Sequence, residues 1–307
     1  MQVSTIGVHE SVESVFPPAE LRDELADLDQ TVRVVGDGDL DACDAVVTFE
    51  HREAFLRSVD WVHSIQAGYD RFPVETFDDA GVVLTNSTGI HGTSVGETVL
   101  GMMLALARRL HAYARNQTER EWAWPAWDEP FTLADERLCV VGLGTLGRGI
   151  AERAAAVGMT VDGVRRTPEP VPHVDEVYAA DDLHEAVADA RFVALATPLT
   201  EATRGLMDRA AFDAMRDDAY FVNVARGACA DQEALVDALQ ARSLAGAALD
   251  VFETEPLPES SPLWEMDDVV VTPHAAAAER DYHRHIADLV RENVRNAADE
   301  EFVNRVA

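Results

Sequence analysis

The chain has 307 residues, enough for two domains, and an apolar content of 47% allows a buried core of ordinary size. It contains 56 acidic residues against 25 basic ones, has no lysine, and carries a net charge of −31. This charge argues against binding to nucleic acid or to an anionic membrane surface. The acids are spread along the chain, which favours a halophilic cytoplasm, where molar salt screens self-repulsion. A merely acidic protein is the alternative.

The N-terminus MQVSTIGVHESV has neither a basic start nor an apolar signal core, and no apolar run reaches 18 residues. We therefore expect a soluble, cytoplasmic protein. The three cysteines lie far apart and form no CxxC or Cys/His cluster, so we expect no metal site and no disulfide framework. They are Cys43, Cys139 and Cys229.

The first ninety residues alternate short apolar runs with helical stretches, which predicts a parallel sheet with right-handed crossovers. Strands are expected at 3–8, 44–49, 61–66 and 81–86, and helices at 19–28 and 52–59. Residues 96–122 read as one long helix whose first half is apolar nearly all round, so it should be buried between domains or subunits. Pro125 and Pro130 then break the pattern.

A second alternating block follows, with strands expected at 136–141, 159–164, 191–198, 219–225, 244–252 and 268–273. The final helical stretch, within 278–300, has no strand after it. We expect it to pack back on the first domain, which makes that domain discontinuous.

A glycine-rich turn, VVGLGTLG, follows the first strand of this block and precedes a helix. Gly142 permits the tight turn, Gly144 lets the backbone approach a pyrophosphate, and Gly147 lets the helix pack on the strand. The helix N-terminus adds free N–H groups for the phosphates. The context predicts a dinucleotide site rather than a turn that is merely rich in glycine.

The next strand ends in VDGVRRTPEP, where an NAD site would carry an acid for the adenosine ribose. Arg165 stands there instead, followed by Arg166 and Thr167. A guanidinium can bond a 2′-phosphate that a carboxylate would repel, so the sequence predicts NADP rather than NAD. The alternative is a solvated surface pair.

Three polar residues follow three strands of the block: Arg226, Glu255 and His274. Ligands of open α/β sheets bind at the carboxyl ends of the strands, so these residues should converge. Histidine can supply the proton that accompanies hydride transfer to a carbonyl, and a neighbouring carboxylate would fix its ring. Arginine can hold a substrate carboxylate, and the set indicates a 2-oxo acid reductase. Taken singly, Arg226 could form a structural ion pair, Glu255 could be one more surface acid, and His274 could cap a helix.

At these residues the chain resembles the D-isomer-specific 2-hydroxyacid dehydrogenase family, through VGLGTLGRGIA, FVNVARG, ALDVFETEPLP and VVVTPHAAA in the family's order. SIQAGYD, TNSTGIHGTSVGET and ATPLTEATRGLMD match as well. The resemblance implies two doubly wound parallel-sheet α/β domains, a flavodoxin-like substrate domain and a Rossmann nucleotide domain, with the active site in the cleft. The expected bounds are 1–93 with 276–307 for the first, and 94–275 for the second.

The resemblance also implies roles for single residues. Arg226, Glu255 and His274 would form the catalytic set, and the backbone at Ala67 and Gly68 would join Arg226 and His274 in binding the substrate. Besides Arg226, His274 and the segment Arg165–Thr167, the cofactor would be held by Leu143, Gly144, Thr145, Leu146, Thr197, Pro198, Thr203, Val224, Ala225, Asp250 and Ala276. The helix from Gly96 resembles the family's dimerisation arm, which implies a homodimer. Trp122, Trp124 and Trp127 would line the pocket or only the dimer interface.

The leading hypothesis is an NADPH-dependent 2-oxo acid reductase, since the short chain fits the glyoxylate/hydroxypyruvate reductase-like branch of the family. A dehydrogenase of formate, phosphite or 3-phosphoglycerate is the close alternative. The candidate substrate loops offer only Arg71 and His91 to a phosphate, which disfavours the last of these. A dinucleotide-sensing protein like the corepressors of this fold is the alternative from another class.

Overall fold

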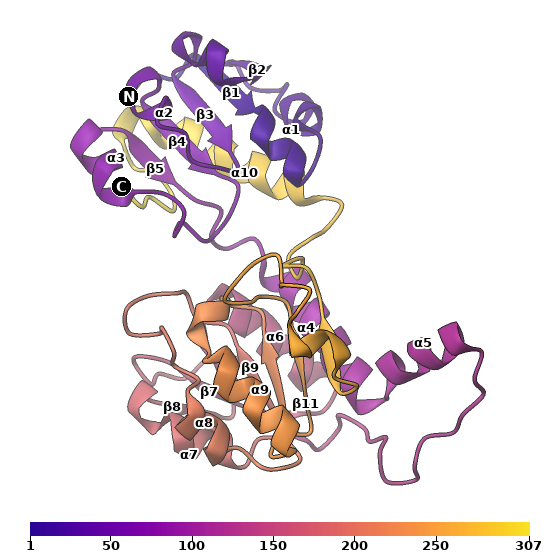
Figure 1. Cartoon of the computed structure of the whole chain (residues 1–307). Coiled ribbons are helices and arrows are strands. Elements are labelled where there is room, and N and C mark those ends of the chain that lie inside the picture. The colour runs from indigo at the N-terminus through magenta and orange to yellow at the C-terminus, as the bar shows by residue number, and fades with distance from the viewer. The chain divides into compact units, whose positions relative to one another are not determined.

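A computed structural model describes residues 1–307, which form two compact units. Unit 1 comprises residues 1–90 and 278–307, and unit 2 comprises residues 91–277 (Figure 1). The expected domain bounds lie within three residues of these. No helix is long and apolar enough to cross a membrane.

Unit 1 is built on a five-stranded parallel sheet in the order β2-β1-β3-β4-β5. The strands are β1 (Thr5–His9), β2 (Thr31–Val35), β3 (Ala45–Thr48), β4 (Trp61–Ser64) and β5 (Val83–Thr85). The sequence analysis missed β2, an edge strand in which only Val35 is buried, so no apolar run marks it. The helices are α1 (Pro18–Glu24), α2 (Phe55–Ser58), α3 (Val74–Ala80), the 3-10 turns η1 (Glu10–Ser14) and η2 (Asp37–Ala42), and α10 (Tyr282–Asn296) with η6 (Ala297–Asp299).

The C-terminal helix α10 belongs to unit 1, as the sequence predicts. Its buried side chains, among them Ile286 and Val290, share one core with the β1 residues Ile6 and Val8. Helix α10, yellow in Figure 1, lies with the indigo and violet elements of unit 1. The amphipathic face of this helix therefore covers the sheet formed by the first ninety residues.

Unit 2 contains a seven-stranded parallel sheet in the order β12-β11-β10-β9-β6-β7-β8. The strands are β6 (Arg137–Val141), β7 (Thr160–Val164), β8 (Glu176–Tyr178), β9 (Phe192–Leu195), β10 (Tyr220–Asn223), β11 (Gly246–Leu249) and β12 (Val269–Val271). The missed strand, β8, has three residues and lies at the sheet edge. The helices are α4 (Gly92–Ala107), α5 (Leu110–Glu119), α6 (Thr145–Ala156), α7 (Leu183–Ala188), α8 (Arg209–Ala214) and α9 (Gln232–Ala241), with 3-10 turns η3 (Ala180–Asp182), η4 (Gly227–Cys229) and η5 (Pro262–Glu265).

The expectation of one helix over residues 96–122 is wrong, because the structure breaks it between α4 and α5. Arg109 adopts the left-handed conformation, with φ of 57°. Its guanidinium pairs with Asp268 at 2.5 Å, and the ring of His111 bonds the Ala105 carbonyl 2.9 Å away. The left-handed residue and these two contacts end α4 at this point. Helix α5 therefore continues in a different direction (Figure 1).

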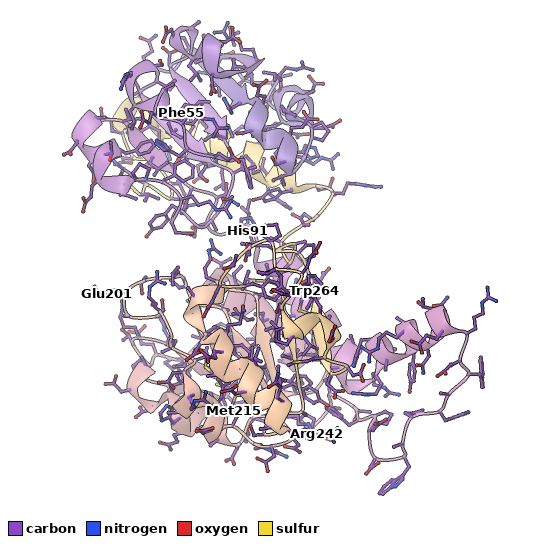
Figure 2. All side chains as sticks on the ribbon, viewed as in Figure 1. Phe55, His91, Glu201, Met215, Arg242 and Trp264 are labelled. Atoms are coloured by element: carbon purple, nitrogen blue, oxygen red, sulfur yellow. The ribbon has the colours of Figure 1, made fainter.

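Helix α4 packs on α6 through glycines. A methyl group added at Gly96 would overlap the Gly149 carbonyl, and one added at Gly149 would overlap the Gly92 carbonyl. The helix backbones therefore meet without intervening side chains. Each unit also has its own apolar core, to which Phe55 contributes in unit 1 and Met215 in unit 2 (Figure 2).

Candidate active site

The glycine-rich turn of unit 2 has the geometry that the sequence predicts. Gly142 has φ of 101°, and an added methyl group would collide with the Ala196 carbonyl. One added at Gly147 would overlap the Gly142 carbonyl, so helix and turn are in backbone contact. Gly144 is exposed, has open space beside it, and precedes α6 without a side-chain cap. The N–H groups of the first turn of α6 are therefore left for an anionic ligand.

The end of β7 lies against this turn. The Gly142 N–H donates to the Val164 carbonyl at 2.8 Å, and the next residue is Arg165. The Arg165 N–H donates to the Tyr178 carbonyl, which fixes the backbone, while neither the Arg165 nor the Arg166 guanidinium has a hydrogen bond or ion pair within the chain. Arg165 is half-buried and Arg166 and Thr167 are exposed. Two uncommitted cations thus stand beside the phosphate-binding turn.

Asp250, which follows β11, is buried and shapes the loop after β12. Its Oδ1 accepts from the Thr272 hydroxyl at 2.6 Å and from the Ala275 N–H at 2.8 Å, while Oδ2 accepts from the Ala276 N–H at 3.0 Å. His274 lies within this loop with φ of 53°, and its N–H donates to the Asp250 carbonyl. Asp250 therefore stabilises the uncommon backbone conformation that presents His274.

His274 and Glu255, which the sequence predicts to act together, are in contact. The His274 Nδ1 lies 2.8 Å from Glu255 Oε2, and Glu255 Oε1 accepts from the Phe252 N–H at 3.0 Å. A carboxylate can only accept, so Nδ1 carries a hydrogen and Nε2 is left for a substrate. The side chains remain 36% and 28% exposed, so the pair can be reached from solvent.

Arg226 enters the same edge of the sheet from the end of β10. The Asn223 amide accepts from the Ala225 N–H at 3.0 Å and donates to the Arg226 carbonyl at 3.3 Å, which fixes the turn. A methyl group added at Gly227 would overlap Phe252 backbone atoms, so this turn touches the loop that leads to Glu255. Val224 and Ala225 are buried beneath it. The three predicted catalytic residues therefore lie on adjoining loops of unit 2.

The segment after β9 is internally bonded. The Thr203 hydroxyl donates to the Pro198 carbonyl at 2.6 Å and accepts from the Thr200 N–H at 2.8 Å. Thr203 thus shapes this loop through its own hydroxyl. The Thr197 hydroxyl oxygen is buried without a partner beside the Gly142 turn.

Ala67 and Gly68 lie in unit 1, in the loop that follows β4. Both are half-buried, and their N–H groups donate to no acceptor within the chain. The sequence analysis did not predict that Asn86 contacts this loop. The signal available was Asn86, the polar residue at the end of the last strand predicted for this unit.

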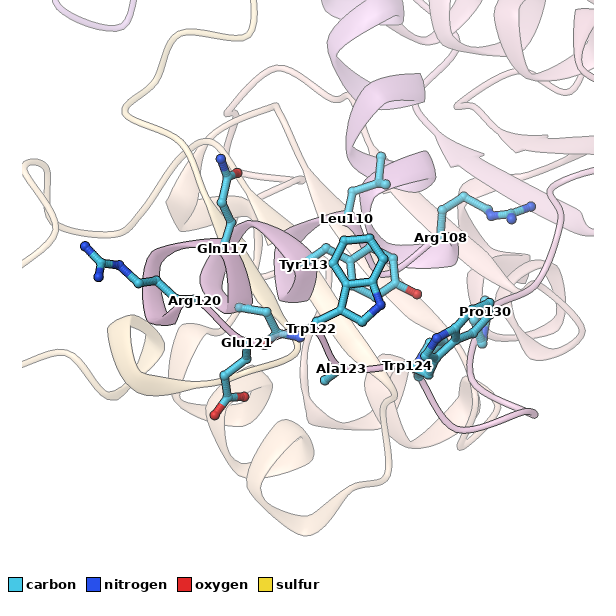
Figure 3. A pocket seen from close by; sticks show the side chains of 12 residues that line it. Arg108, Leu110, Tyr113, Gln117, Arg120, Glu121, Trp122, Ala123, Trp124 and Pro130 are labelled. Atoms are coloured by element: carbon cyan, nitrogen blue, oxygen red, sulfur yellow. The ribbon is translucent and has the colours of Figure 1, made fainter.

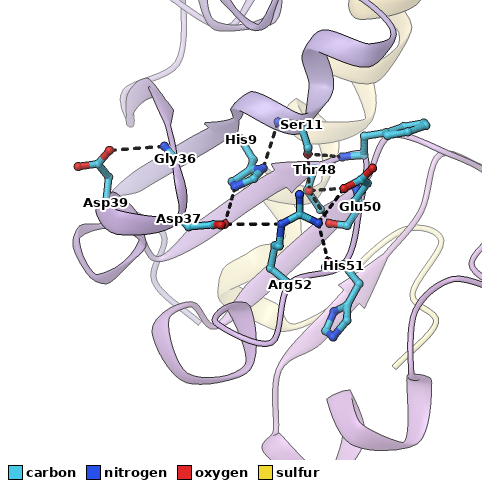
Figure 4. A network of polar contacts seen from close by, with 10 residues as sticks. His9, Ser11, Gly36, Asp37, Asp39, Thr48, Glu50, His51 and Arg52 are labelled. Atoms are coloured by element: carbon cyan, nitrogen blue, oxygen red, sulfur yellow. Dashed lines mark hydrogen bonds and ion pairs between the residues drawn. The ribbon is translucent and has the colours of Figure 1, made fainter.

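A second polar cluster of unit 1 also escaped the sequence analysis (Figure 4). His9, at the end of β1, lies 3.0 Å from Asp37, and Arg52 lies 2.7 Å from Glu50 and 3.7 Å from Asp37. Arg52 therefore has two carboxylate partners, Glu50 and Asp37. Arg52 is a cation near the ends of β1 and β3 whose partners are already supplied by the chain.

The arm formed by α5 and residues 120–131 projects from unit 2 (Figure 1). The indoles of Trp122, Trp124 and Trp127 are 94%, 87% and 93% exposed. A pocket of about 810 Å³ is lined by Trp122 and Trp124 together with Leu110, Tyr113 and Pro130 (Figure 3). Three exposed indoles in six residues form an apolar surface that is unusual for a monomer.

The two parallel-sheet units, with a glycine-rich nucleotide turn and an Arg–Glu–His set in unit 2, define a Rossmann-like nucleotide-dependent oxidoreductase. Residues 100–276 match the sequence model of the family described as D-isomer specific 2-hydroxyacid dehydrogenase, NAD binding domain. The chain belongs to the D-isomer-specific 2-hydroxyacid dehydrogenase family, and small hydroxyacid substrates fit that family.

Among its relatives is the glyoxylate reductase of Korarchaeum cryptofilum, 34% identical over 234 residues that cover 74% of this chain and 69% of the relative. The D-3-phosphoglycerate dehydrogenase of Methanocaldococcus jannaschii is 33% identical over 78% of this chain, but the match spans only 45% of that longer protein. A family member from Xanthobacter autotrophicus Py2, in complex with NADPH and MES, superposes with a TM-score of 0.82 at 30% identity, covering 100% of this chain and 98% of that one.

Proposed function

We propose that this chain is an NADPH-dependent reductase that converts a 2-oxo acid to the (R)-2-hydroxy acid. The observation that carries the proposal is the His274–Glu255 pair, because the contact uses Nδ1 and leaves Nε2 available to a substrate oxygen. NADPH, when bound, supplies the hydride. The chain itself supplies a proton donor, a cation that binds the substrate carboxylate, and backbone N–H groups that bind the same carboxylate.

His274 donates the proton from Nε2 to the carbonyl oxygen as the hydride reaches the carbon. Glu255 accepts from Nδ1 and thereby fixes the orientation of the ring. Arg226 binds the substrate carboxylate and polarises the carbonyl. We also propose that the N–H groups of Ala67 and Gly68 in unit 1 bind a substrate carboxylate.

The residues present fit a dinucleotide phosphate. The open N–H groups at the start of α6 and the exposed Gly144 suit a pyrophosphate. Arg165 and Arg166 suit the 2′-phosphate, since no acid of the chain engages them. The NADPH named for the Xanthobacter relative supports this choice. Comparing kcat/KM for NADPH and NADH tests it, and equal use of both would refute it.

A 2-oxo acid fits better than a phosphate-bearing substrate. The cation near the ends of β1 and β3 of unit 1, Arg52, is already paired with Glu50 and Asp37. Rates with glyoxylate, pyruvate, hydroxypyruvate and a longer 2-oxo acid, followed at 340 nm in high salt, test the reaction. Turnover of 3-phosphoglycerate alone would favour the phosphoglycerate branch.

A dinucleotide-sensing protein is the second candidate, because the same fold can bind a nucleotide without turnover. Saturable NADPH binding with no turnover across the whole substrate panel would favour it. The intact His274–Glu255 contact speaks for the enzyme.

We propose that the arm joins two copies of this chain. The arm carries the three indoles of Trp122, Trp124 and Trp127, which are 94%, 87% and 93% exposed. A second copy of the chain would cover this apolar surface. Sedimentation of the parent and of the triple variant Trp122→Ser, Trp124→Ser, Trp127→Ser tests this. We expect the parent to be a dimer and the variant to be a monomer. A parent that sediments as a monomer would refute the homodimer.

High-salt adaptation is proposed from the excess of acids, since strong screening reduces their mutual repulsion. Circular dichroism of the parent in dilute buffer and in molar salt tests this. We expect the folded signal and the melting temperature to be lower in dilute buffer. Full stability without salt would contradict the proposal.

A further inference from the structure

Unit 1 contains a chain of buried neutral hydrogen bonds that ends at the Ala67–Gly68 loop. Trp61 Nε1 donates to the Thr85 hydroxyl at 2.8 Å, and that hydroxyl lies 2.8 Å from His63 Nδ1. His63 Nε2 lies 3.1 Å from the Ser87 hydroxyl, which donates to the Ser64 carbonyl at 2.9 Å. Because the Ser87 hydroxyl donates to Ser64, Nε2 donates to Ser87. In the neutral ring the Thr85 hydroxyl, which also lies 3.5 Å from the Val62 carbonyl, donates to Nδ1.

Burial supports the same state, because it lowers the pKa of His63 to about 3. All of Trp61, His63, Thr85 and Ser87 are inaccessible to solvent. This chain of bonds therefore fixes Ser87, whose backbone contacts the loop after β4.

Two consecutive peptide groups of that loop are anchored at their oxygens. The Ser87 N–H donates to the Gln66 carbonyl at 3.0 Å, and the Asn86 Nδ2 donates to the Ala67 carbonyl at 2.7 Å. A peptide group is planar and trans, so its N–H points opposite to its C=O. Anchoring the Gln66 and Ala67 oxygens therefore directs the N–H groups of Ala67 and Gly68 away from Ser87 and Asn86.

Asn86 is itself held on three sides. Its Oδ1 accepts from the Thr88 N–H at 3.1 Å, its N–H donates to the Asn304 carbonyl at 3.1 Å, and the residue is 4% exposed. The Nδ2 group therefore has a defined direction and cannot turn to water.

We propose that Asn86 is a positioning residue for substrate binding, which sets the direction in which the Gly68 N–H meets the substrate carboxylate. This inference rests on the proposed 2-oxo acid reduction. Asn86 acts through the peptide group and not by touching the substrate. Loss of its amide frees the 67–68 peptide to rotate, so substrate binding weakens while NADPH binding does not change.

The test compares Asn86→Ala and Asn86→Ser with the parent. We expect KM for the oxo acid, and the inhibition constant of oxamate, to rise about ten-fold or more, since small misplacements of binding groups have large effects. KM for NADPH should stay within about two-fold. Ser58→Ala is the matched control: it removes another side-chain hydrogen bond of unit 1, the 2.6 Å bond from Ser58 to Asp41, which involves neither Asn86 nor its partners, and it should leave both KM values unchanged.

Asn86→Asp gives a pH signature that a purely structural role would not. An ionised carboxylate repels the Ala67 carbonyl, whereas a protonated one can donate to it. The ratio of variant to parent KM should therefore fall as the pH is lowered from about 8 to about 5. Folded Asn86 variants with the parent's KM for the oxo acid would overturn the inference and leave the proposed function intact. A parent that reduces no 2-oxo acid would overturn both.

Discussion

The carboxyl edges of the two sheets present different chemical groups. The edge of unit 2 presents charged side chains, with Arg226, Glu255 and His274 on adjoining loops and Asp250 buried beneath them. The edge of unit 1 presents backbone N–H groups held by the neutral residues His63 and Asn86, and its charged residues pair among themselves. The difference supports the proposal that the edge of unit 2 supplies the proton and the cation, while the edge of unit 1 supplies oriented N–H groups.

The largest expected effect comes from removing the proton donor of unit 2. His274→Asn should lower kcat by about 10²- to 10⁴-fold, the usual contribution of general acid catalysis. Binding of NADPH, measured by fluorescence titration, should change little. His184→Asn, at an exposed histidine of the same unit, should retain full activity. A His274→Asn enzyme with near-parental kcat would contradict the assignment of the proton to unit 2.

The next effect concerns the cations at the end of β7. Arg165→Asp should lower kcat/KM for NADPH by about 10- to 100-fold, because hydrogen bonds to charged groups contribute about 1.5–3 kcal/mol. The same change should alter kcat/KM for NADH far less. Arg242→Asp, at an exposed arginine of the same unit, controls for the added negative charge. An equal loss with both cofactors would show that Arg165 does not select the 2′-phosphate.

A third expectation concerns the stability of unit 1. The pKa of His63 is about 3 in the folded chain and about 6.5 in an unfolded one, so only the unfolded state binds a proton between these values. The stabilisation from neutral His63 is therefore complete above about pH 6.5 and is lost as the pH falls towards 3, by at most about 1.4 kcal/mol per pH unit. Urea unfolding at several pH values should show a shallower pH dependence in His63→Gln than in the parent.

The smallest effect is expected at the charged cluster of unit 1. Arg52→Ala should change the free energy of unfolding by about 1 kcal/mol or less, because the guanidinium is 36% exposed and its pairs with Glu50 and Asp37 are screened by solvent. The effect should shrink further in molar salt. A several-fold change in KM for the oxo acid would instead show that Arg52 takes part in substrate binding.

Much of unit 2 could be predicted from the sequence because its signals are local. The glycines at 142, 144 and 147 must suit a tight turn and close packing, and the structure shows both. Strands buried on both faces read as apolar runs, whereas the edge strands β2 and β8 do not. The break at Arg109 could not be predicted, since it depends on an ion pair with Asp268, 159 residues away.

The sequence by itself determined the alternating α/β architecture, the nucleotide turn and the order of Arg226, Glu255 and His274, because each depends on neighbouring residues or on where strands end. Tertiary structure decided the contact between His274 and Glu255, the use of the Asp250 carboxylate by the loop after β12, and the anchoring of Ala67 by Asn86. Each of these joins segments 19 to 26 residues apart, so only the packing of adjacent strands brings the partners together.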